Sequence, residues 1–213
     1  MPILLPRPLS SARFYAILDT GYAPVSRFGE LARAVLAGGA DIIQVRAKKS
    51  TTAERIELLK AVAPLCAAAG VPLVCNDDLA ATLAVSDVGL HIGQDDLPAR
   101  EARKLLGPDR VLGLSTHSLA QAQGALALSD VLTYFAVGPI YKTGTKPDYP
   151  PVGLELVQAV AALKPALPWF CIGGINLQNA PQVRVAGARA LVAVSEVLLA
   201  QNPAAMVKAF RGD

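Results

Sequence analysis

Short apolar runs rich in β-branched residues alternate with longer alanine- and leucine-rich stretches along the whole chain. We expect the short runs to be strands. They cover residues 13–20, 41–47, 72–77, 89–93, 110–116, 133–140, 169–174 and 190–195. Because strands that are apolar on both faces and are each followed by a helix form parallel sheets, the alternation predicts an α/β protein.

Eight such units in one chain predict a TIM (β/α)8 barrel, which needs about 200 residues or more. A doubly wound open sheet is the alternative, but such sheets usually have fewer strands. The 213 residues contain no linker and no low-complexity tract. We therefore expect a single domain over residues 1–213.

Composition narrows the class of partner. The net charge is only +3 and aromatic residues make up 5% of the chain, so nucleic acid is not expected. The mean hydropathy is +0.40, yet no run reaches the roughly 18 apolar residues of a membrane span. The apolar surplus therefore predicts a large core and no membrane partner, and it leaves homo-oligomerisation open.

The cysteines and the first residues indicate a compartment. Cys66, Cys75 and Cys171 are widely spaced and odd in number, which favours buried thiols over a disulfide or zinc framework. The opening segment MPILLPRPLSSAR interrupts its apolar stretch with proline and has no basic residue before it, so it is a poor signal peptide. We expect a cytoplasmic protein.

Polar side chains gather where the predicted strands end, which is where a barrel keeps its reactive groups. In chain order these residues are Gln44, Arg46, Lys48, Lys49, Asn76, Asp77, Asp78, Gln94, Asp95, Asp96, Ser115, Thr116, His117, Thr143, Thr145, Lys146, Gly173, Gly174, Val194 and Ser195. The other ends of the strands show no comparable cluster. The sequence therefore predicts one functional face.

The second predicted strand ends in a basic group. Alternation along the strand sends Gln44, Arg46 and Lys48 to one face. Val45 and Ala47 then face the other way. Long polar side chains on one face of a buried strand are costly unless they meet anions or water, so they indicate an anion site. A solvated strand end with incidental ion pairs is the alternative.

Two aspartates follow neighbouring predicted strands. Asp77 and Asp96 are close enough in this arrangement for one ion to bridge them, and carboxylate oxygens suit Mg²⁺. The alternative role is helix N-capping. Asp78 and Asp95 are the better candidates for caps because each stands next to a predicted helix start.

Glycines and histidines complete the set. Backbone N–H groups after Gly174, and near Ser195, match the phosphate site common in this fold, although the glycines could simply form a tight turn. We expect His91, inside an apolar strand, to be a buried structural residue. His117 could reach the site, but zinc is not expected because a third ligand is missing.

Eight segments together resemble the thiamine-phosphate synthase family in order and spacing. They are YAILD, QVRAKK, CNDD, GLHIGQDDLP, GLSTH, VGPIYKTGTKPDYPPVGLE, CIGGIN and VAVSEVL, between about residues 13 and 200. The resemblance implies a TIM barrel that joins 4-amino-2-methyl-5-(diphosphooxymethyl)pyrimidine to 4-methyl-5-(2-phosphooxyethyl)thiazole. It also implies release of pyrophosphate and a requirement for Mg²⁺.

The resemblance assigns roles residue by residue. The residues implied to hold the pyrimidine pyrophosphate are Gln44, Arg46, Lys48, Asn76, Ser115 and Lys146. Those implied to hold the thiazole phosphate are Thr143, Thr145, Gly174, Val194 and Ser195. We include the intervening Val45, Ala47 and Gly144 among the substrate-binding residues. Asp77 and Asp96 are the implied Mg²⁺ ligands, and the catalytic residues are Arg46, Lys48, Lys146 and Ser115.

The chain departs from the family pattern at three positions, Cys75, Asp78 and Glu196, and Asp78 adds negative charge beside the metal. The implied chemistry is a dissociative substitution, for which residues 141–151 would form a lid that supplies ligands. Three other functions remain open. They are a thiazole tautomerase using His117, a non-catalytic sensor of a phosphorylated thiamine precursor, and an aldolase forming a Schiff base on Lys48.

Overall fold

The computed structural model describes residues 8–144 and 150–212, and its eight strands form one closed barrel in chain order. The strands are β1 (Phe14–Asp19), β2 (Ile42–Arg46), β3 (Leu73–Asn76), β4 (Val88–Ile92), β5 (Leu112–Thr116), β6 (Tyr134–Val137), β7 (Trp169–Ile172) and β8 (Ala190–Ala193). Every pair is parallel, and β8 closes on β1. The predicted TIM barrel is confirmed, and the open-sheet alternative is wrong.

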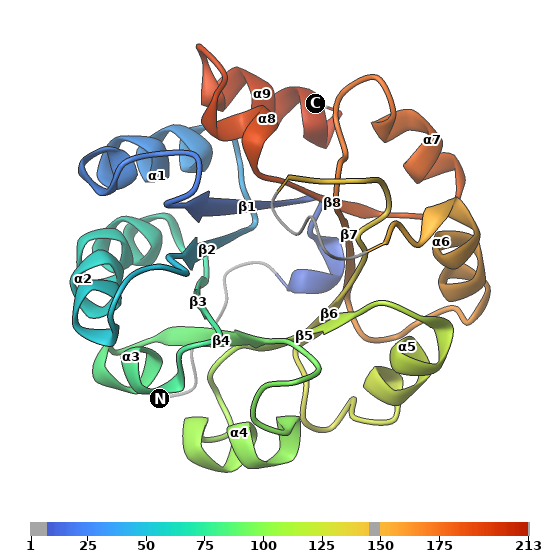
Figure 1. The fold of residues 1–213 in the computed structure, drawn as a ribbon, viewed down its shortest axis with the longest axis horizontal. Coiled ribbons are helices and arrows are strands. Elements are labelled where there is room, and N and C mark those ends of the chain that lie inside the picture. The colour runs from blue at the N-terminus through green and yellow to red at the C-terminus, as the bar shows by residue number, and fades with distance from the viewer. Residues whose placement is uncertain (1–7, 145–149, 213) are drawn as a thin grey trace.

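The helices surround this ring of strands (Figure 1). They are α1 (Phe28–Ala37), α2 (Thr52–Ala69), α3 (Leu79–Ala84), α4 (Ala99–Leu106), α5 (Leu119–Leu126), α6 (Gly153–Ala162), α7 (Ala180–Val185), α8 (Ser195–Leu198) and α9 (Pro203–Arg211), with 3-10 turns η1 (Leu9–Ser11) and η2 (Val25–Arg27). No helix in the described part of the chain is both long enough and apolar enough to cross a membrane.

Helix starts test the two predicted caps. Asp78 caps α3 by accepting a hydrogen bond from the backbone N–H of Ala81 at 2.9 Å, as expected. Asp95 is not a cap, because α4 begins at Ala99 and its N-cap residue is Pro98, which offers no side-chain acceptor. Asp95 was expected beside a helix start, whereas residues 93–98 form a loop.

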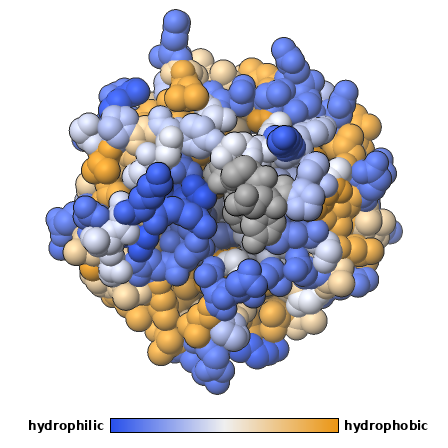
Figure 2. All heavy atoms as spheres, in the orientation of Figure 1, coloured by the Kyte–Doolittle hydropathy of each residue, from blue (hydrophilic) through white to orange (hydrophobic). Residues whose placement is uncertain are grey.

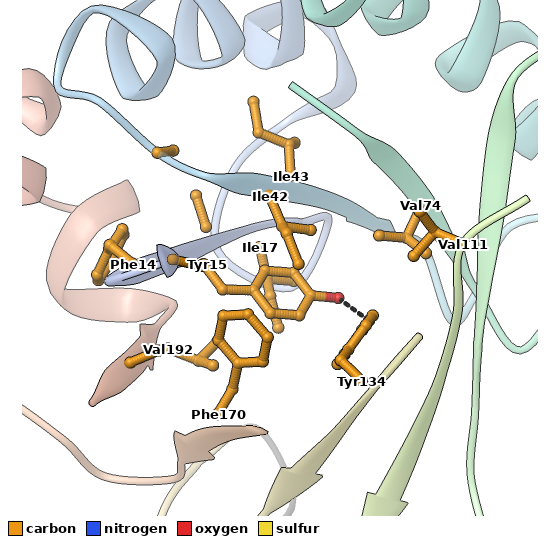
Figure 3. Close-up of a cluster of buried hydrophobic side chains, with 14 of the residues drawn as sticks. Phe14, Tyr15, Ile17, Ile42, Ile43, Val74, Val111, Tyr134, Phe170 and Val192 are labelled. Atoms are coloured by element: carbon orange, nitrogen blue, oxygen red, sulfur yellow. Dashed lines mark hydrogen bonds between the residues drawn. The ribbon is translucent and has the colours of Figure 1, made fainter. Parts of the chain in front are cut away.

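The barrel interior is closed by aromatic rings. Tyr15, Tyr134 and Phe170 are fully buried and meet edge to face, with ring centroids 5.3 to 5.7 Å apart. Figure 3 shows these rings converging from β1, β6 and β7. Edge-to-face pairs add about 0.5–1.5 kcal/mol each beyond the burial of their area, so this layer is a rigid floor beneath the C-terminal end of the barrel.

The three cysteines behave as expected from their spacing. All three are free thiols buried in the protein. Burial raises the pKa of Cys66 to about 12 and that of Cys75 to about 11. Because the thiolate is the reactive form, these residues act as core packing.

A buried ion pair fastens the N-terminal end of the barrel. Asp41 accepts hydrogen bonds from the backbone N–H groups of Arg13 and Phe14, and from the guanidinium of Arg211 at 2.7 Å. Arg211 also donates to the carbonyl of Gly39. This contact ties the start of β1 and the loop before β2 to the last helix, α9.

Candidate active site

A cavity of about 140 Å³ lies at the C-terminal ends of the strands. The sequence-predicted residues that line it are Gln44, Arg46, Asn76, Ser115, Thr143, Gly174, Val194 and Ser195. They come from β2, β3, β5 and the segments after β6, β7 and β8. Figure 2, drawn from the same side as Figure 1, shows hydrophilic side chains gathered beside the centre of this face.

Other predicted residues lie elsewhere. Val45 and Ala47 are buried in the hydrophobic core, and they are not among the residues that line the cavity. Lys48 lies outside the cavity wall with an exposed side chain, and Gly144 is close to the hydroxyl of Tyr22. Thr145 and Lys146, with the rest of residues 145–149 of the expected lid, fall outside the described residues.

Arg46 is held by a residue that the sequence analysis did not select. Asp19 ends β1 and stands directly opposite Arg46 in the register of β1 and β2. Its Oδ2 lies 2.5 Å from the guanidinium of Arg46, and its Oδ1 accepts from the backbone N–H of Gly21. The signal that could have identified it was a charged residue near the C-terminal end of an apolar strand, beside a predicted basic group on the next strand.

Asp77 and Asp96 lie together, as predicted from their strands. Burial raises the pKa of Asp77, and the nearby carboxylate of Asp96 raises it further, whereas Lys48 lowers it. The ammonium of Lys48 is 3.8 Å from Asp77 Oδ2. Asp96 Oδ2 accepts from the backbone N–H of Gly93 at 2.7 Å.

This pair fits a divalent cation. The carboxylate of Asp96 raises the pKa of Asp77, so the two side chains form a site whose repulsion a cation would remove, and hard oxygen donors suit Mg²⁺. The pair lies at the rim beside Asn76, which lines the cavity. A metal here would still need further ligands from water or from a bound anion, because the described residues contain no group of three or more ligating side chains.

Asp78 does not add free negative charge to this pair. Arg55 reaches its Oδ2 at 2.8 Å, Thr52 donates to the same oxygen, and Oδ1 caps α3. These contacts lower the pKa of Asp78 even though burial opposes them. The departure from the family pattern is therefore neutralised by Arg55.

A chain of hydrogen bonds crosses the floor of the cavity. Gln44 Nε2 donates to the hydroxyl of Tyr15 at 2.6 Å, and that hydroxyl is 2.8 Å from the hydroxyl of Tyr134. His91 contacts Tyr134 through Nδ1 and Ser115 Oγ through Nε2, both at 2.9 Å. The expectation of a buried, hydrogen-bonded His91 is confirmed, but this residue also lines the cavity.

Sequence reasoning missed the role of both tyrosines, because each sits in an apolar strand and has the pattern of a core residue. Burial raises the pKa of both hydroxyls well above the ordinary value, so both stay protonated. Gly113 makes room for one of them, since a Cβ at that position would lie 2.2 Å from Tyr134 Cζ. A glycine opposite a tyrosine on the next strand was the available signal.

The glycine turn after β7 packs against the segment after β6. Gly174 has a φ of +63°, and a Cβ there would lie 2.6 Å from the carbonyl oxygen of Lys142. Tyr141 donates its backbone N–H to the carbonyl of Gly173 at 2.9 Å. Glycine is therefore required both for the backbone conformation and for the close approach. Ser195 lies on the same cavity wall and begins α8.

His117 lines the cavity, as the sequence analysis allowed. Its Nδ1 contacts the carbonyl oxygen of Gly138, and its backbone N–H donates to Gln121 Oε1 at 2.6 Å. The ring is thereby fixed between β5 and the segment after β6.

Fold and site together define a TIM-barrel protein with a basic, polar wall and a glycine turn facing one cavity, the arrangement of an enzyme acting on phosphorylated compounds. The profile of the family described as "Thiamine monophosphate synthase" matches residues 14–197. Two relatives named thiamine-phosphate synthase are each 42% identical to this chain. The one from Acidothermus cellulolyticus aligns over 92% of both chains, and the one from Streptomyces avermitilis over 95% of this chain and 93% of its own.

A solved structure agrees with the sequence comparisons. Thiamine phosphate pyrophosphorylase from Pyrococcus furiosus superposes with a TM-score of 0.85 at 27% identity, over 97% of this chain and 96% of that one. The chain belongs to the thiamine-phosphate synthase family.

Proposed function

We propose that this chain makes thiamine phosphate by coupling the pyrimidine pyrophosphate with the thiazole phosphate and releasing pyrophosphate. One observation carries the proposal. A single cavity has Arg46, Asn76 and Ser115 on one side and the Gly174 turn with Ser195 on the other. A coupling enzyme needs two anion subsites that open on one shared space. We assign one subsite to each of these two sides of the cavity.

The residues on the polar side are suited to a leaving pyrophosphate. Arg46 presents a guanidinium oriented by Asp19, and the ammonium group of Lys48 is a second positive charge at the rim. We assign Lys146 to the same subsite from the sequence alone. Positive groups fixed where charge develops stabilise a departing anion because they need no reorganisation during the reaction.

Asp77 and Asp96 are the residues that would hold Mg²⁺, since the carboxylate of Asp77 interacts with that of Asp96 and with the side chain of Asn76. When bound, the ion supplies positive charge that makes pyrophosphate a better leaving group. The chain's own contribution is then to position the pyrimidine and to exclude water. A dissociative step leaves a cationic pyrimidine methylene, which water would otherwise trap before the thiazole nitrogen attacks.

The thiazole phosphate is assigned to the opposite wall. Gly174 allows a phosphate to approach the backbone, and Ser195 offers both a hydroxyl and a backbone N–H. Thr143 lines the same cavity, and Thr145 joins this set from the sequence alone. We propose that one barrel domain carries the whole reaction, in the cytoplasm.

Site chemistry favours this activity over the others. A tautomerase using His117 has no need of the carboxylate pair or of the oriented Arg46. An aldolase based on Lys48 would need that amine inside the cavity, but Lys48 is exposed at the rim. A sensor remains to be separated by experiment, because binding alone would use the same wall.

Calorimetry tests the two-subsite arrangement. Pyrophosphate is titrated into the protein with and without Mg²⁺, and the thiazole phosphate is titrated separately. We expect tight pyrophosphate binding only with Mg²⁺, and thiazole phosphate binding that is independent of it. If the two anions compete for one site, the proposed arrangement is wrong.

A further inference from the structure

The hydrogen-bond chain on the cavity floor has a direction that can be worked out atom by atom. Gln44 Nε2 can only donate, so the hydroxyl oxygen of Tyr15 accepts. Tyr15 then has one hydrogen of its own, and its other contact among the described residues is the hydroxyl of Tyr134. When Tyr15 donates to Tyr134, the hydrogen of Tyr15 forms a hydrogen bond, and the hydrogen of Tyr134 is left to donate to His91.

The opposite direction leaves a buried hydrogen unused. If Tyr134 donated to Tyr15, the oxygen of Tyr15 would accept twice and its own hydrogen would lack a contact among the described residues. The hydroxyl belongs to a side chain only 1% exposed, so an unmade hydrogen bond there is costly. Tyr134, having accepted from Tyr15, donates to Nδ1 of His91.

The hydrogen bond from Tyr134 to His91 also determines the direction of the hydrogen bond between His91 and Ser115. A ring nitrogen that accepts a hydrogen bond carries no hydrogen, so a neutral His91 carries its hydrogen on Nε2. Nε2–H then donates to Ser115 Oγ at 2.9 Å. Ser115 has used an oxygen lone pair in this contact, and its own O–H remains to donate into the cavity that it lines.

We propose that Tyr134 is a positioning residue that fixes the tautomer of His91 and thereby makes Ser115 a hydrogen-bond donor to the cavity. Gln44 keeps its carbonyl oxygen as an acceptor at the other end of the chain. The floor therefore presents a fixed pattern, donor on β5 and acceptor on β2. A donor at Ser115 suits a group that only accepts, such as a pyrophosphate oxygen, and in this respect the inference rests on the proposed function.

The geometry around Tyr134 supports a built contact. Its ring stacks on that of His91 with an interplanar angle of 23°, and it is held edge to face by Tyr15 and Phe170. Figure 3 shows the hydroxyl of Tyr15 directed at Tyr134. The side chain that would block this place is absent at Gly113. These ring contacts fix the position of the Tyr134 hydroxyl and hold it next to Tyr15 and His91.

Nitrogen NMR of histidine-labelled protein tests the tautomer directly. The chain has only 2 histidines, so a His117→Gln variant assigns the signals of His91. We expect a protonated Nε2 and an unprotonated Nδ1, both in the free protein and with Mg²⁺ and pyrophosphate added. The hydrogen on Nδ1, or a doubly protonated ring, would overturn the proposal without any variant being made.

Two matched hydroxyl deletions test the role of Tyr134. Tyr134→Phe removes the donor to Nδ1, so we expect His91 to lose its single tautomer and pyrophosphate binding with Mg²⁺ to weaken about tenfold, the loss of one hydrogen bond to a charged group. Tyr15→Phe removes a hydroxyl from the same cluster but leaves the contact between Tyr134 and His91. We expect it to keep the Nε2–H tautomer.

Three outcomes of these variants decide the matter. If Tyr134→Phe keeps the wild-type tautomer, or if it loses the tautomer and binds pyrophosphate as well as wild type does, the positioning role is wrong. If Tyr134→Phe fails to fold, the wild-type spectra still decide the direction of the chain. None of these spectra requires turnover, so an inactive protein with the expected tautomer would contradict the proposed function and leave this inference standing.

Discussion

Asp19 and Arg46 stand opposite each other at the ends of β1 and β2 and form an ion pair in which the two side chains are only 2% and 11% exposed. Arg46 is therefore both a candidate substrate ligand and one half of a buried charge pair. Removing the Arg46 side chain is therefore expected to affect both catalysis and stability. From the sequence alone, we predict only that coupling slows while the fold survives.

We predict that Arg46→Ala slows coupling strongly and also lowers the free energy of unfolding by about 3–5 kcal/mol, because the buried carboxylate of Asp19 loses its partner. Lys48→Ala is the matched control. Its ion pair with Asp77 is long and partly exposed, so the expected loss of stability is below about 1 kcal/mol. Urea unfolding and steady-state coupling rates measure both effects. Equal stability of the two variants, or rates close to wild type for both, would contradict this account.

The carboxylate pair gives a stability that depends on pH and on Mg²⁺. The pKa of Asp77 is raised by burial and by Asp96, so without metal its contribution to stability is present at low pH and is lost as the pH rises through that raised pKa. Asp77→Asn cannot ionise. We expect this variant to gain stability relative to wild type as the pH rises, and Mg²⁺ to reverse the order by binding the wild-type pair.

Urea unfolding at about pH 4 and about pH 8, with and without Mg²⁺, checks this crossover against the ordinary aspartate pKa near 4. Asp77→Asn and Asp96→Asn should also reduce coupling by orders of magnitude while leaving thiazole phosphate binding unchanged. Stabilisation of the Asn variants by Mg²⁺ to the same extent as wild type would show that these carboxylates do not hold the metal.

The glycine turn is expected to be essential for one substrate only. Gly174→Ala places a Cβ 2.6 Å from the carbonyl oxygen of Lys142 at a positive φ, so the turn must move. We predict weaker thiazole phosphate binding and unchanged binding of pyrophosphate with Mg²⁺. Gly212→Ala is the control, because it shares a positive φ but has nothing within 4 Å. That variant should lose only about 1–2 kcal/mol of stability. Equal effects of both variants on thiazole phosphate would refute a local role.

The ion pair between Arg211 and Asp41 at the N-terminal end of the barrel should matter for stability alone. Arg211→Ala leaves Asp41 buried with its carboxylate short of a cation, and we expect the free energy of unfolding to fall by about 3 kcal/mol or more. Arg100→Ala breaks an exposed pair with Asp130 and should cost less than about 1 kcal/mol. Substrate affinity should be unaffected in both. A change of affinity in Arg211→Ala would mean that the two ends of the barrel are coupled.

Hydrophobic pattern predicted the barrel because each strand is apolar on both faces and closes against its neighbours. The same pattern located Gln44, Arg46, Asn76 and Ser115 on the cavity wall, since strand ends of a parallel barrel share one face. Helix starts were harder to place. Asp95 was assigned as a cap although α4 begins after Pro98, because loop length has no signature in hydrophobic periodicity.

Contacts between strands account for what the sequence did not reveal. Asp19 acts through a partner 27 positions away, and Tyr15 meets Tyr134 across 119 positions. Both pairings depend on strand register, which the pattern of apolar residues does not specify between separate strands. Tyr15 and Tyr134 have the pattern of core residues, and only the closed barrel brings their hydroxyls together.

Pyrophosphate release in a coupling assay tests the central claim most directly. The protein is supplied with the pyrimidine pyrophosphate alone, with the thiazole phosphate alone, and with both, each in the presence and absence of Mg²⁺. We predict that pyrophosphate and thiamine phosphate appear in equal amounts only when both substrates and Mg²⁺ are present. Absence of product under that condition, from protein that binds both substrates, would contradict the account and favour a sensor.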